Sequence, residues 1–371
     1  MDYIVTQQID VLHDEVVRLH AQLMNGGLRM SRSYLRWKYL DNPLIQPPIM
    51  IVVRYGKKIV GMRGIVGTQW QLGDAGKPLL LGHADDLIID PEHRNRGLFL
   101  RINETMVDVA RERGFEYLIS LSSGERTQKL SLLCEWQALG ELERMYTDPA
   151  GSGEKSGRAA QTHASGRRIF RAIRNRLGYD CVRPPFDHSI DGSLRGIVTS
   201  TSPRVEVSAE ADPTSMSALA AAVHSGRSRA SRDEAFFDWR LRNPQRKYRY
   251  VYWRDSQLRG YLVLAWTRRD ANTIVVADHA AESESVFVDL VDALTRSRRG
   301  ALSLMSSTLP GPELQAAEAA GFARDPNHEK DQMRQFLFYP LAENTEPLLR
   351  GAKSATFPRD WHVCPLDTMA S

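Results

Sequence analysis

The residues best suited to chemistry lie at one junction between a strand and a helix. The apolar run Leu87-Ile88-Ile89 is followed by the turn Asp90-Pro91-Glu92-His93, and a helix is predicted to begin at Gly97. A helix N-terminus leaves backbone N–H groups without partners, and together with the helix dipole these groups can bind a phosphate. Gly97 would let a phosphate approach the backbone closely, and Arg94 and Arg96 would add positive charge. The spacing therefore predicts a pyrophosphate-binding turn.

Three polar side chains interrupt the strand that leads into this turn. His83, Asp85 and Asp86 stand in an otherwise apolar run, and imidazole and carboxylate groups can take up or release protons during a reaction. Strict alternation along a strand places His83 and Asp85 on one face of the sheet and Asp86 on the other, although a β-bulge would shift this parity. An equally good interpretation is that these groups pair with polar neighbours at the end of a strand.

Other catalytic and binding signatures are missing from the sequence. It has neither a GxGxxG dinucleotide fingerprint nor a GxxxxGK[ST] triphosphate loop, and no G-x-S-x-G elbow supports a Ser-His-Asp hydrolase. Cys134, Cys181 and Cys364 are far apart and lack a CxxC or His-rich companion. We therefore predict no metal site, no disulfide framework and no activated thiol.

Composition limits the class of protein. A chain of 371 residues suffices for two domains, and 42% hydrophobic with 25% charged residues is typical of a globular protein. No apolar run approaches the roughly 18 residues of a membrane span, and no signal-peptide pattern opens the chain, which predicts a cytoplasmic protein. The net charge of +4 is modest, so nucleic acid is not the expected partner. Seven Lys/Arg residues lie in Lys155–Arg176, which fits a solvated linker better than a weak contact with a membrane surface.

Periodicity and turn residues indicate the elements that would position the polar residues. Antiparallel strands give way to strand–helix–strand, which indicates an α/β sheet with a helix that crosses over it. The predicted elements, in order, are helices over Asp10–Met24 and Ser31–Leu40, a hairpin of Ile49–Tyr55 and Ile59–Gly67, a strand over Leu79–Ile89, a helix over Gly97–Arg113 and a strand over Phe115–Leu121.

An internal repeat divides the chain. The stretch Trp37-Lys38-Tyr39-Leu40-Asp41-Asn42-Pro43, preceded by Ser31-Arg32, returns as Trp239-Arg240-Leu241-Arg242-Asn243-Pro244, preceded by Ser231-Arg232. Further matches follow in the same order: Gly61 with Gly260, Leu98–Leu121 with Val286–Met305, and Glu135-Trp136 with Gly321-Phe322. A period of about 200 residues is too long for a solenoid and fits two copies of one domain. Trp37 and Trp239 are interpreted as core residues in preference to ligand-stacking residues.

The second copy lacks the phosphate-binding turn. Between a predicted strand at Thr273–Ala277 and a helix that begins near Ser283, it has Asp278-His279-Ala280-Ala281-Glu282 in place of Arg-x-x-Gly. Its acidic residues would repel a pyrophosphate. We therefore predict one such site per chain.

The turn resembles the acetyl-coenzyme A signature of the GNAT superfamily of N-acetyltransferases, R/Q-x-x-G-x-G/A. Arg94, Gly97 and the lead-in Ile89–Pro91 match this signature, and Phe99 departs from its last position. The whole chain is similar to tandem GNAT proteins that carry a Trp-Lys-Tyr…Asn-Pro stretch and are associated with N-acylation of amino sugars in surface-polysaccharide pathways. The closing segment Trp361–Asp367 resembles theirs as well.

The resemblance implies a fold and a donor. The expected fold class is α/β, with two tandem GNAT-like domains, each a mixed, mostly antiparallel sheet flanked by helices, and a V-shaped splay between Leu81–Ile89 and Phe115–Leu121. Acetyl-CoA or another acyl-CoA would lie in that splay. Backbone groups of Leu87, Ile88 and Ile89 would pair with the pantetheine arm. The pyrophosphate would be held by the amides of Arg94, Asn95, Arg96, Gly97, Leu98 and Phe99.

The resemblance also implies a division of the chain. Residues 1–150 would form the catalytic acyl-CoA-binding domain, 151–204 a basic linker with a short helix at Arg167–Leu177, 205–342 a degenerate copy and 343–371 a tail. The acceptor would be a small primary amine, with a nucleotide-linked amino sugar preferred. An antibiotic, a polyamine, a protein lysine, or a non-catalytic binding role for the same scaffold are the alternatives. The sequence predicts no oligomeric state.

The same resemblance implies roles in proton transfer. His83 stands where many GNAT enzymes place a base, Asp85 is beside it, and Asp86 matches an acidic position of the tandem subgroup. The tyrosine that commonly acts as the acid is replaced by Ser131. Either the thiolate leaves without a protein acid, or Tyr146, Cys134 or a residue of the second copy supplies one. The residues that could face the acceptor, or could simply form a turn, are Ser122, Ser123 and Glu125.

Overall fold

The structure is a computed structural model of the chain. It describes residues 2–8, 10–24, 27–73, 78–121, 124–147, 204–223, 226–267, 273–296, 301–324, 334–341 and 361–368. The predicted linker helix Arg167–Leu177 and the basic stretch Lys155–Arg176 lie outside these residues. No helix in the described ranges is long and apolar enough to cross a membrane.

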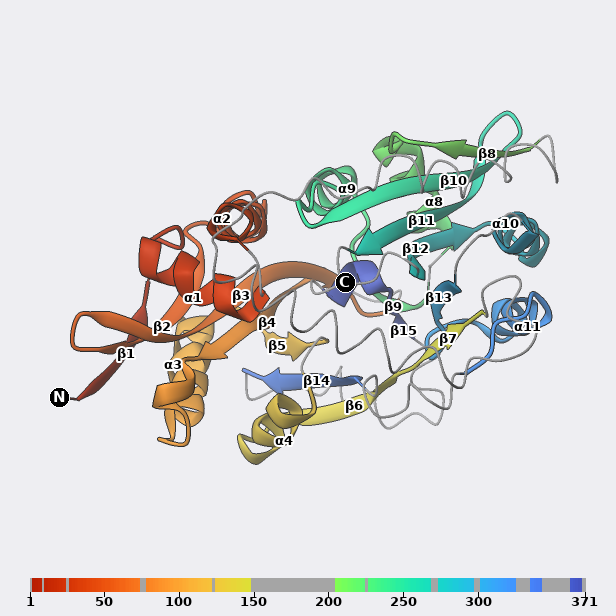
Figure 1. Ribbon diagram of the computed structural model, residues 1–371. Helices are drawn as coiled ribbons and strands as arrows, with labels where there is room; N and C mark the ends of the chain where they lie inside the picture. Colours follow the sequence, from red (N-terminus) through yellow and green to blue (C-terminus); the bar gives the residue numbers. More distant parts are fainter. Residues whose placement is uncertain are drawn as a thin grey trace, which may run out of the picture.

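Two mixed, mostly antiparallel sheets flanked by helices form the molecule, which confirms the predicted fold class (Figure 1). The first sheet has the order β1-β2-β3-β4-β5-β14-β6, and β9 pairs with the end of β3 and with β15. Its strands are β1 (Tyr3–Gln7), β2 (Ile49–Tyr55), β3 (Lys58–Gln71), β4 (Leu79–Ile89), β5 (Tyr117–Ser120), β14 (Arg334–Pro340), β6 (Gln137–Leu142), β9 (Ser228–Ala230) and β15 (Trp361–His362).

The second sheet has the order β7-β13-β12-β11-β10-β8. Its strands are β7 (Arg144–Tyr146), β13 (Ala301–Met305), β12 (Thr273–Ala281), β11 (Leu258–Thr267), β10 (Arg246–Arg254) and β8 (Val205–Ser208). In each sheet one parallel neighbour pair, β4–β5 or β12–β13, is joined through a helix. This is the strand–helix–strand unit that the sequence predicted.

Helices cover both faces of the first sheet. Helix α3 (Leu98–Glu112) buries Leu98, Ile102, Met106 and Ala110, which recur every four residues and form one apolar stripe. The opposite face packs against α1 (Asp14–Met24) and α2 (Leu28–Leu35), which continues as a π-helix over Arg36–Leu40. The other helices within the described ranges are α4 (Glu125–Leu133), α8 (Pro213–Val223), α9 (Glu234–Arg240), α10 (Glu284–Arg296) and α11 (Gly311–Ala319), with 3-10 turns at Pro91–His93 and Pro365–Thr368.

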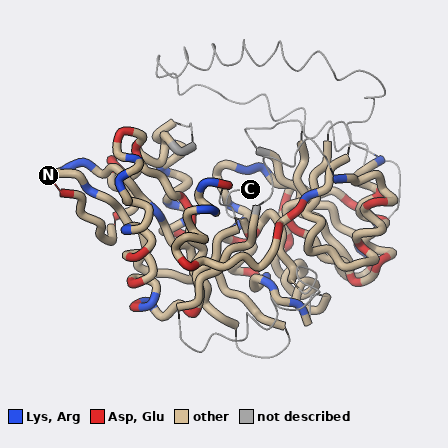
Figure 2. The backbone as a smooth tube through the Cα atoms, turned by 90° about the horizontal axis from the view of Figure 1, so that it is seen from below, with Lys and Arg blue, Asp and Glu red and all other residues tan. Residues whose placement is uncertain are grey.

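The two halves of the chain exchange strands. Strand β14, from the C-terminal half, lies between β5 and β6 of the first sheet, and β7, from the N-terminal half, pairs with β13 of the second (Figure 1). The C-terminal segment 361–368 lies between the two lobes, where β15 pairs with β9 (Figure 1). Basic and acidic positions are interspersed along the described backbone of both lobes (Figure 2). The sheets therefore do not divide the chain at the predicted boundaries of 150, 205 and 342, because each half completes the other's sheet.

The internal repeat is a structural duplication. The strand pairs β2–β3 and β10–β11 both have a β-bulge next to the matched glycines Gly61 and Gly260. Glu135 and its counterpart Gly321 both have positive φ, at 65° and 89°. Local irregularities of this kind are retained with the backbone around them, so their coincidence supports two copies of one domain.

The copies meet at a pair of reciprocal contacts. Nε1 of Trp37 donates to the carbonyl of Trp239 at 2.7 Å, and Nε1 of Trp239 donates to the carbonyl of Trp37 at 2.8 Å. The two rings stack with their centroids 5.8 Å apart, and the Arg240 guanidinium lies over both. Such self-complementary exchange is the pattern of a two-fold interface, here within one chain. Both tryptophans are buried at this contact between the copies, which we call the seam, as their interpretation as core residues predicted.

Several predicted boundaries were wrong, since the second helix begins at Leu28 rather than Ser31 and β3 ends at Gln71 rather than Gly67. The first helix begins at Asp14, not Asp10, and strand β1 precedes it. Asp278 and His279 belong to strand β12, which continues to Ala281, and do not form a loop. A charged residue is tolerated inside this strand because Arg232 and Tyr261 both donate hydrogen bonds to the buried Asp278 carboxylate.

Candidate functional site

Strands β4 and β5 part where the sequence predicted a splay. They pair at Leu81 with Tyr117, at Gly82 with Leu118 and at His83 with Ile119, and the ladder stops there. β4 runs on to Ile89, whereas β5 ends at Ser120. The last residues of β4 therefore extend beyond the strand next to them. This exposes the backbone edge on which the pantetheine arm was expected.

A β-bulge lies in β4 at the start of the splay. Gly64 pairs with Asp85 and Met62 with Ile88, so β4 carries one more residue than β3 between these pairs. Asp86 is the extra residue, and its φ of 52° lies in the left-handed region. The bulge turns Asp86 to the same side as Asp85. The expectation from strict alternation, which separated the two carboxylates, was wrong for this reason.

One buried lysine holds both carboxylates. Nζ of Lys38 lies 2.7 Å from Oδ2 of Asp85 and 2.9 Å from Oδ2 of Asp86, and it donates to the hydroxyl of Tyr34 at 3.2 Å. The hydroxyl of Tyr39 donates to Asp86 at 2.7 Å. Gly64 makes this approach possible, because a Cβ there would stand 2.0 Å from the Tyr39 hydroxyl oxygen. We call Lys38, Asp85, Asp86, Tyr34 and Tyr39 the bulge network.

Electrostatics keep Lys38 and Asp86 of the bulge network ionised. Burial alone would raise the pKa of Asp86, but the Lys38 ammonium outweighs it and holds this pKa well below its usual value. Burial alone would lower the pKa of Lys38, but Asp85 and Asp86 raise it well above its usual value. Lys38 and Asp86 therefore form a buried ion pair at neutral pH. The side chain of Asp85 is more exposed than those of Lys38 and Asp86, with 16% of its surface accessible.

His83 joins the two strands at the point where they part. Its Nε2 accepts a hydrogen bond from the backbone N–H of Leu121 at 3.2 Å, just past the end of β5. Burial lowers the pKa of His83 to about 4, so the imidazole is neutral at pH 7. Its lone pair is used by the Leu121 amide. This contact satisfies a backbone group that the splay leaves without a strand partner.

The turn after β4 has the geometry of an anion site. Gly97 is the N-cap of α3 with a φ of 70°, and no atom lies within 4 Å of where its Cβ would be. The amides of the first helical turn have no partner within the helix. Arg96 lies in the same turn, and Arg126, at the start of α4, reaches Oδ1 of Asn95 at 3.2 Å. Open space, free amides and several guanidinium groups fit the pyrophosphate of an acyl-CoA.

The remaining residues predicted to bind the donor would contribute backbone groups rather than side chains. Leu98 and Phe99 are buried, and Leu98 and Ile88 belong to the hydrophobic clusters on the two faces of the sheet. The carbonyl of Ile89 already accepts a hydrogen bond from Nε of Arg94 at 3.0 Å. This contact holds the Arg94 side chain against the end of β4.

Comparison with known proteins places this site in a family. Residues 18–131 match the model of the acetyltransferase (GNAT) family. That range includes the bulge network, the splay and the turn. The N-terminal copy is a GNAT acetyltransferase domain. The chain is thus an acyl-CoA-dependent N-acyltransferase.

Solved structures share the fold of the whole tandem arrangement. A GCN5-related N-acetyltransferase from Anabaena variabilis has 13% identity and a TM-score of 0.59, over 92% of this chain and 73% of that one. A probable N-acyltransferase from Enterococcus faecalis has 8% identity and a TM-score of 0.58, over 92% and 72%. A tandem GNAT protein from the clavulanic acid biosynthesis pathway has 11% identity and a TM-score of 0.52, over 92% and 99%. No curated protein sequence matches the chain.

The residue at the usual acid position, the predicted acid candidates and the residues predicted to face the acceptor lie in different places. The Ser131 hydroxyl is buried without a hydrogen-bond partner. Tyr146 belongs to β7, which pairs in the second sheet. Cys134 is half-buried, and burial raises its pKa. Ser122 and Ser123 lie outside the described residues, and Glu125 begins α4, where it pairs with Lys129.

Sequence reasoning missed most of the bulge network. Lys38 and Tyr39 were noted only as part of the repeat, and Tyr34 was not singled out. A usable signal was present, because the second copy keeps the tryptophan but replaces Lys38-Tyr39 with Arg240-Leu241. Residues that differ between a catalytic copy and a degenerate copy are candidates for function. Arg126 carried no such signal, since only the fold brings α4 to the turn.

A cavity of about 440 Å³ lies elsewhere, on the seam between the copies. It is lined by repeat positions that include Trp37, Trp239, Pro43 and Pro244, and by none of the residues of the splay or the turn. The bulge network lies on β4 where β4 and β5 part, and the Arg94–Gly97 turn follows the end of the same strand, so the candidate site lies at the splay and not at this cavity.

Replacement of His83 by glutamine is expected to weaken the pH dependence of stability. The folded-state pKa of about 4 lies below the unfolded value of 6.5, so the contribution of His83 is complete above pH 6.5 and is lost as the pH falls toward 4. That loss is on the order of 3 kcal/mol. A glutamine can still accept the Leu121 N–H but does not titrate. Denaturant unfolding at pH 7 and pH 4.5 measures the difference, and equal pH dependence in both proteins would contradict it.

Proposed function

We propose that this acyltransferase moves an acetyl or short acyl group from acyl-CoA to a small primary amine, with Asp85 as the base. The observation that carries the proposal is the position of Asp85. It is the partly exposed member of a carboxylate pair, and it lies where β4 and β5 part. An amine must be neutral to attack a thioester, so a proton acceptor is needed at that point.

Each part of the site would have its own role. Acyl-CoA supplies the activated acyl thioester. The amides of residues 94–99 and the side chains of Arg94, Arg96 and Arg126 would hold its pyrophosphate, and the backbone of residues 87–89 would align its pantetheine arm. Lys38 fixes the Asp85 carboxylate through a 2.7 Å contact. The Asp85 carboxylate would take the proton of the amine, directly or through a water.

Asp86 and His83 would act as positioning residues. Asp86 balances the charge of the buried Lys38 and accepts the Tyr39 hydroxyl hydrogen bond, which leaves Asp85 as the more exposed carboxylate of the pair. His83 fixes the end of β5 through the Leu121 amide. The proposal assigns no protein acid to the leaving thiolate.

The favoured acceptor is a nucleotide-linked amino sugar. This choice is supported by the resemblance to tandem GNAT proteins that carry the Trp-Lys-Tyr…Asn-Pro stretch. Release of free thiol from acetyl-CoA should be measured with nucleotide-linked amino sugars, an aminoglycoside, a polyamine and a lysine peptide. We expect the amino sugars to be the best acceptors, and preference for another amine would overturn this choice. Turnover of none, with binding of acetyl-CoA, would favour a non-catalytic scaffold.

Gly97→Ala is expected to raise the Kd of acetyl-CoA at least tenfold, because the new methyl group would stand where the phosphate approaches the backbone. Gly114 is a matched control at the other end of α3. It has a φ of 74°, against 70° for Gly97, and no atom lies within 4 Å of its Cβ position either. Alanine should cost about 1 kcal/mol of stability at both positions. Calorimetric titration measures Kd, and equal binding by the two variants would contradict the assignment.

A further inference from the structure

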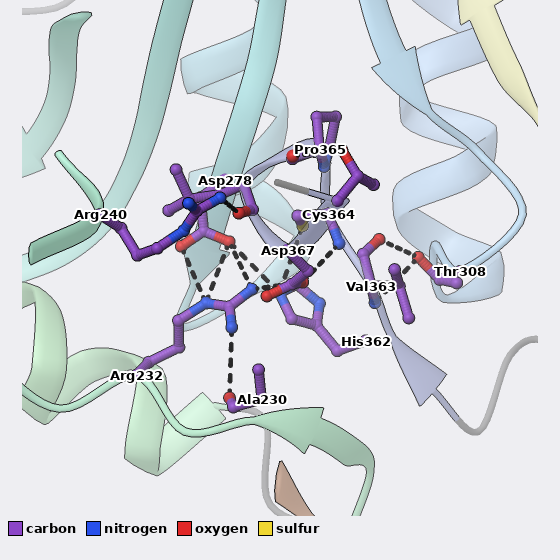
Figure 3. A network of polar contacts seen from close by, with 12 residues as sticks. Ala230, Arg232, Arg240, Asp278, Thr308, His362, Val363, Cys364, Pro365 and Asp367 are labelled. Carbon is purple, nitrogen blue, oxygen red and sulfur yellow. Dashed lines mark hydrogen bonds and ion pairs between the residues drawn. The ribbon is translucent and has the colours of Figure 1, made fainter. Parts of the chain in front are cut away.

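The C-terminal copy contains a cluster of potential metal ligands. Asp278 is the counterpart of Asp85, because it pairs with Val263 just as Asp85 pairs with Gly64, three residues after the matched glycines. Here the C-terminal segment covers it, and His362 and Cys364 lie beside it (Figure 3). One ligand atom each of Asp278, His362 and Cys364 lies within 4.8 Å of the other two, and all three residues are buried.

A fourth donor approaches the same thiol. Sγ of Cys364 lies 3.4 Å from Nε2 of His362 and 3.6 Å from Nδ1 of His279, and that Nε2 lies 3.8 Å from Oδ1 of Asp278. In a tetrahedral zinc site, neighbouring sulfur and nitrogen ligands are about 3.5 Å apart, since Zn–S is near 2.3 Å and Zn–N near 2.0 Å. The two sulfur–nitrogen separations therefore match those between neighbouring ligands of a small four-coordinate ion. Thiolate with imidazole is the ligand combination that selects Zn²⁺ over Mg²⁺ or Ca²⁺.

The groups around the cluster orient two of these donors. Nε2 of His279 faces Oε2 of Glu313 at 3.4 Å, which leaves Nδ1 to face the thiol. A carboxylate behind a ligating histidine is the usual outer partner in zinc sites. Arg232 contacts Asp278 at 3.1 Å and Asp367 at 2.8 Å, and the fork of its guanidinium fixes both carboxylates (Figure 3).

From this arrangement we propose that Asp278, His279, His362 and Cys364 form a structural binding site for a zinc-like transition-metal ion. The ion would connect β12 to the C-terminal segment, which lies between the two lobes. It would have no part in the acyl transfer, since Cys364 is only 1% exposed and no substrate could reach it. The sequence predicted no metal site because the donors come from two segments more than 80 residues apart, with neither CxxC nor a His-rich run.

Metal binding would cost one weak contact of His362. Nδ1 of His362 faces Nη1 of Arg227 at 3.5 Å, the long limit of a hydrogen bond. Coordination through Nε2 places the ring proton on Nδ1, so this weak contact would be lost. Arg227 keeps its contacts with the carbonyls of Trp361 and Thr308.

Cobalt titration of the untagged full-length chain, stripped of metal with a chelator, tests the site. We expect one Co²⁺ per chain, a thiolate-to-cobalt charge-transfer band, the visible bands of four-coordinate cobalt, and displacement by Zn²⁺. Cys364→Ser should abolish the charge-transfer band. Cys134→Ser is the matched control, because it removes the other described cysteine and should retain the full signal. Absence of the band in the natural chain, or its persistence in Cys364→Ser, would overturn the proposal.

A second variant covers the case in which Cys364→Ser does not fold. His362→Gln keeps the thiol, so the charge-transfer band should remain while the affinity for Co²⁺ falls at least tenfold. Glu313→Gln should weaken binding about 10- to 100-fold, as the loss of an outer partner does. Unchanged affinity in His362→Gln would reject the site. Acetyltransferase activity plays no part in these readouts, so they stand apart from the proposed function.

Discussion

Asp85→Asn is expected to lower kcat by at least 100-fold and to leave the Kd of acetyl-CoA nearly unchanged. Removal of a positioned general base typically costs 10² to 10⁴ in rate, and an amide cannot take the proton of the amine. The Arg94–Gly97 turn, which is proposed to hold the donor, is not altered by this change. Because Lys38 keeps its 2.9 Å contact with Asp86, the buried ammonium retains a partner and the fold should persist.

Steady-state kinetics and acetyl-CoA titration together separate this outcome from a structural effect. Asp212→Asn is a suitable control, because Asp212 is also an ion-paired carboxylate, 2.7 Å from Arg254, and lies in the C-terminal copy. It should keep the activity of the natural chain. If Asp85→Asn retains kcat within fivefold, Asp85 is not the base. A rise in Kd with unchanged kcat would assign the residue to donor binding instead.

Trp239→Ala is expected to destabilise the chain by about 3 to 5 kcal/mol, the usual cost of truncating a buried tryptophan. The change removes the stacked ring, the hydrogen bond to the carbonyl of Trp37 and the surface under Arg240. It also leaves that carbonyl buried without its partner. Since the two halves exchange β7 and β14, both sheets should unfold in one transition at a lower denaturant concentration.

Phenylalanine variants isolate the reciprocal hydrogen bonds. Trp37→Phe and Trp239→Phe each keep a ring and remove one N–H donor. Each should lower the free energy of unfolding by about 1 to 3 kcal/mol. The double variant should deviate from additivity by at least 0.5 kcal/mol, because the residues contact each other. Denaturant unfolding followed by circular dichroism measures all four proteins. Strict additivity, or separate transitions for the two halves, would contradict an energetic coupling across the seam.

Local patterns in the sequence were enough for several elements. The alternation of apolar residues predicted β2 and β4 with their observed ends, and the strand–turn–helix pattern predicted α3 to within a residue at each end. The Arg94–Gly97 turn could be predicted because short-range backbone requirements, such as a left-handed glycine before a helix, leave a mark in the sequence. The repeat was visible for the same reason, since both copies retain the same turns and bulges.

Long-range partners left no such mark. The exchange of β7 and β14 depends on which sheet edge each strand can complete, and the local period of a strand does not specify its neighbour. The bulge at Asp86 likewise depends on Lys38 and Tyr39, which approach from 47 residues away.

The sequence by itself therefore predicted a duplicated chain with an acyltransferase domain and a turn between β4 and α3, because each of these features leaves a pattern in short stretches of neighbouring residues. Only the tertiary structure decided that Asp85 and Asp86 share one lysine and that Asp278, His279, His362 and Cys364 converge. Ion pairs and ligand clusters depend on distances of 3 to 4 Å between segments far apart in the chain, and only packing of the whole fold sets those distances.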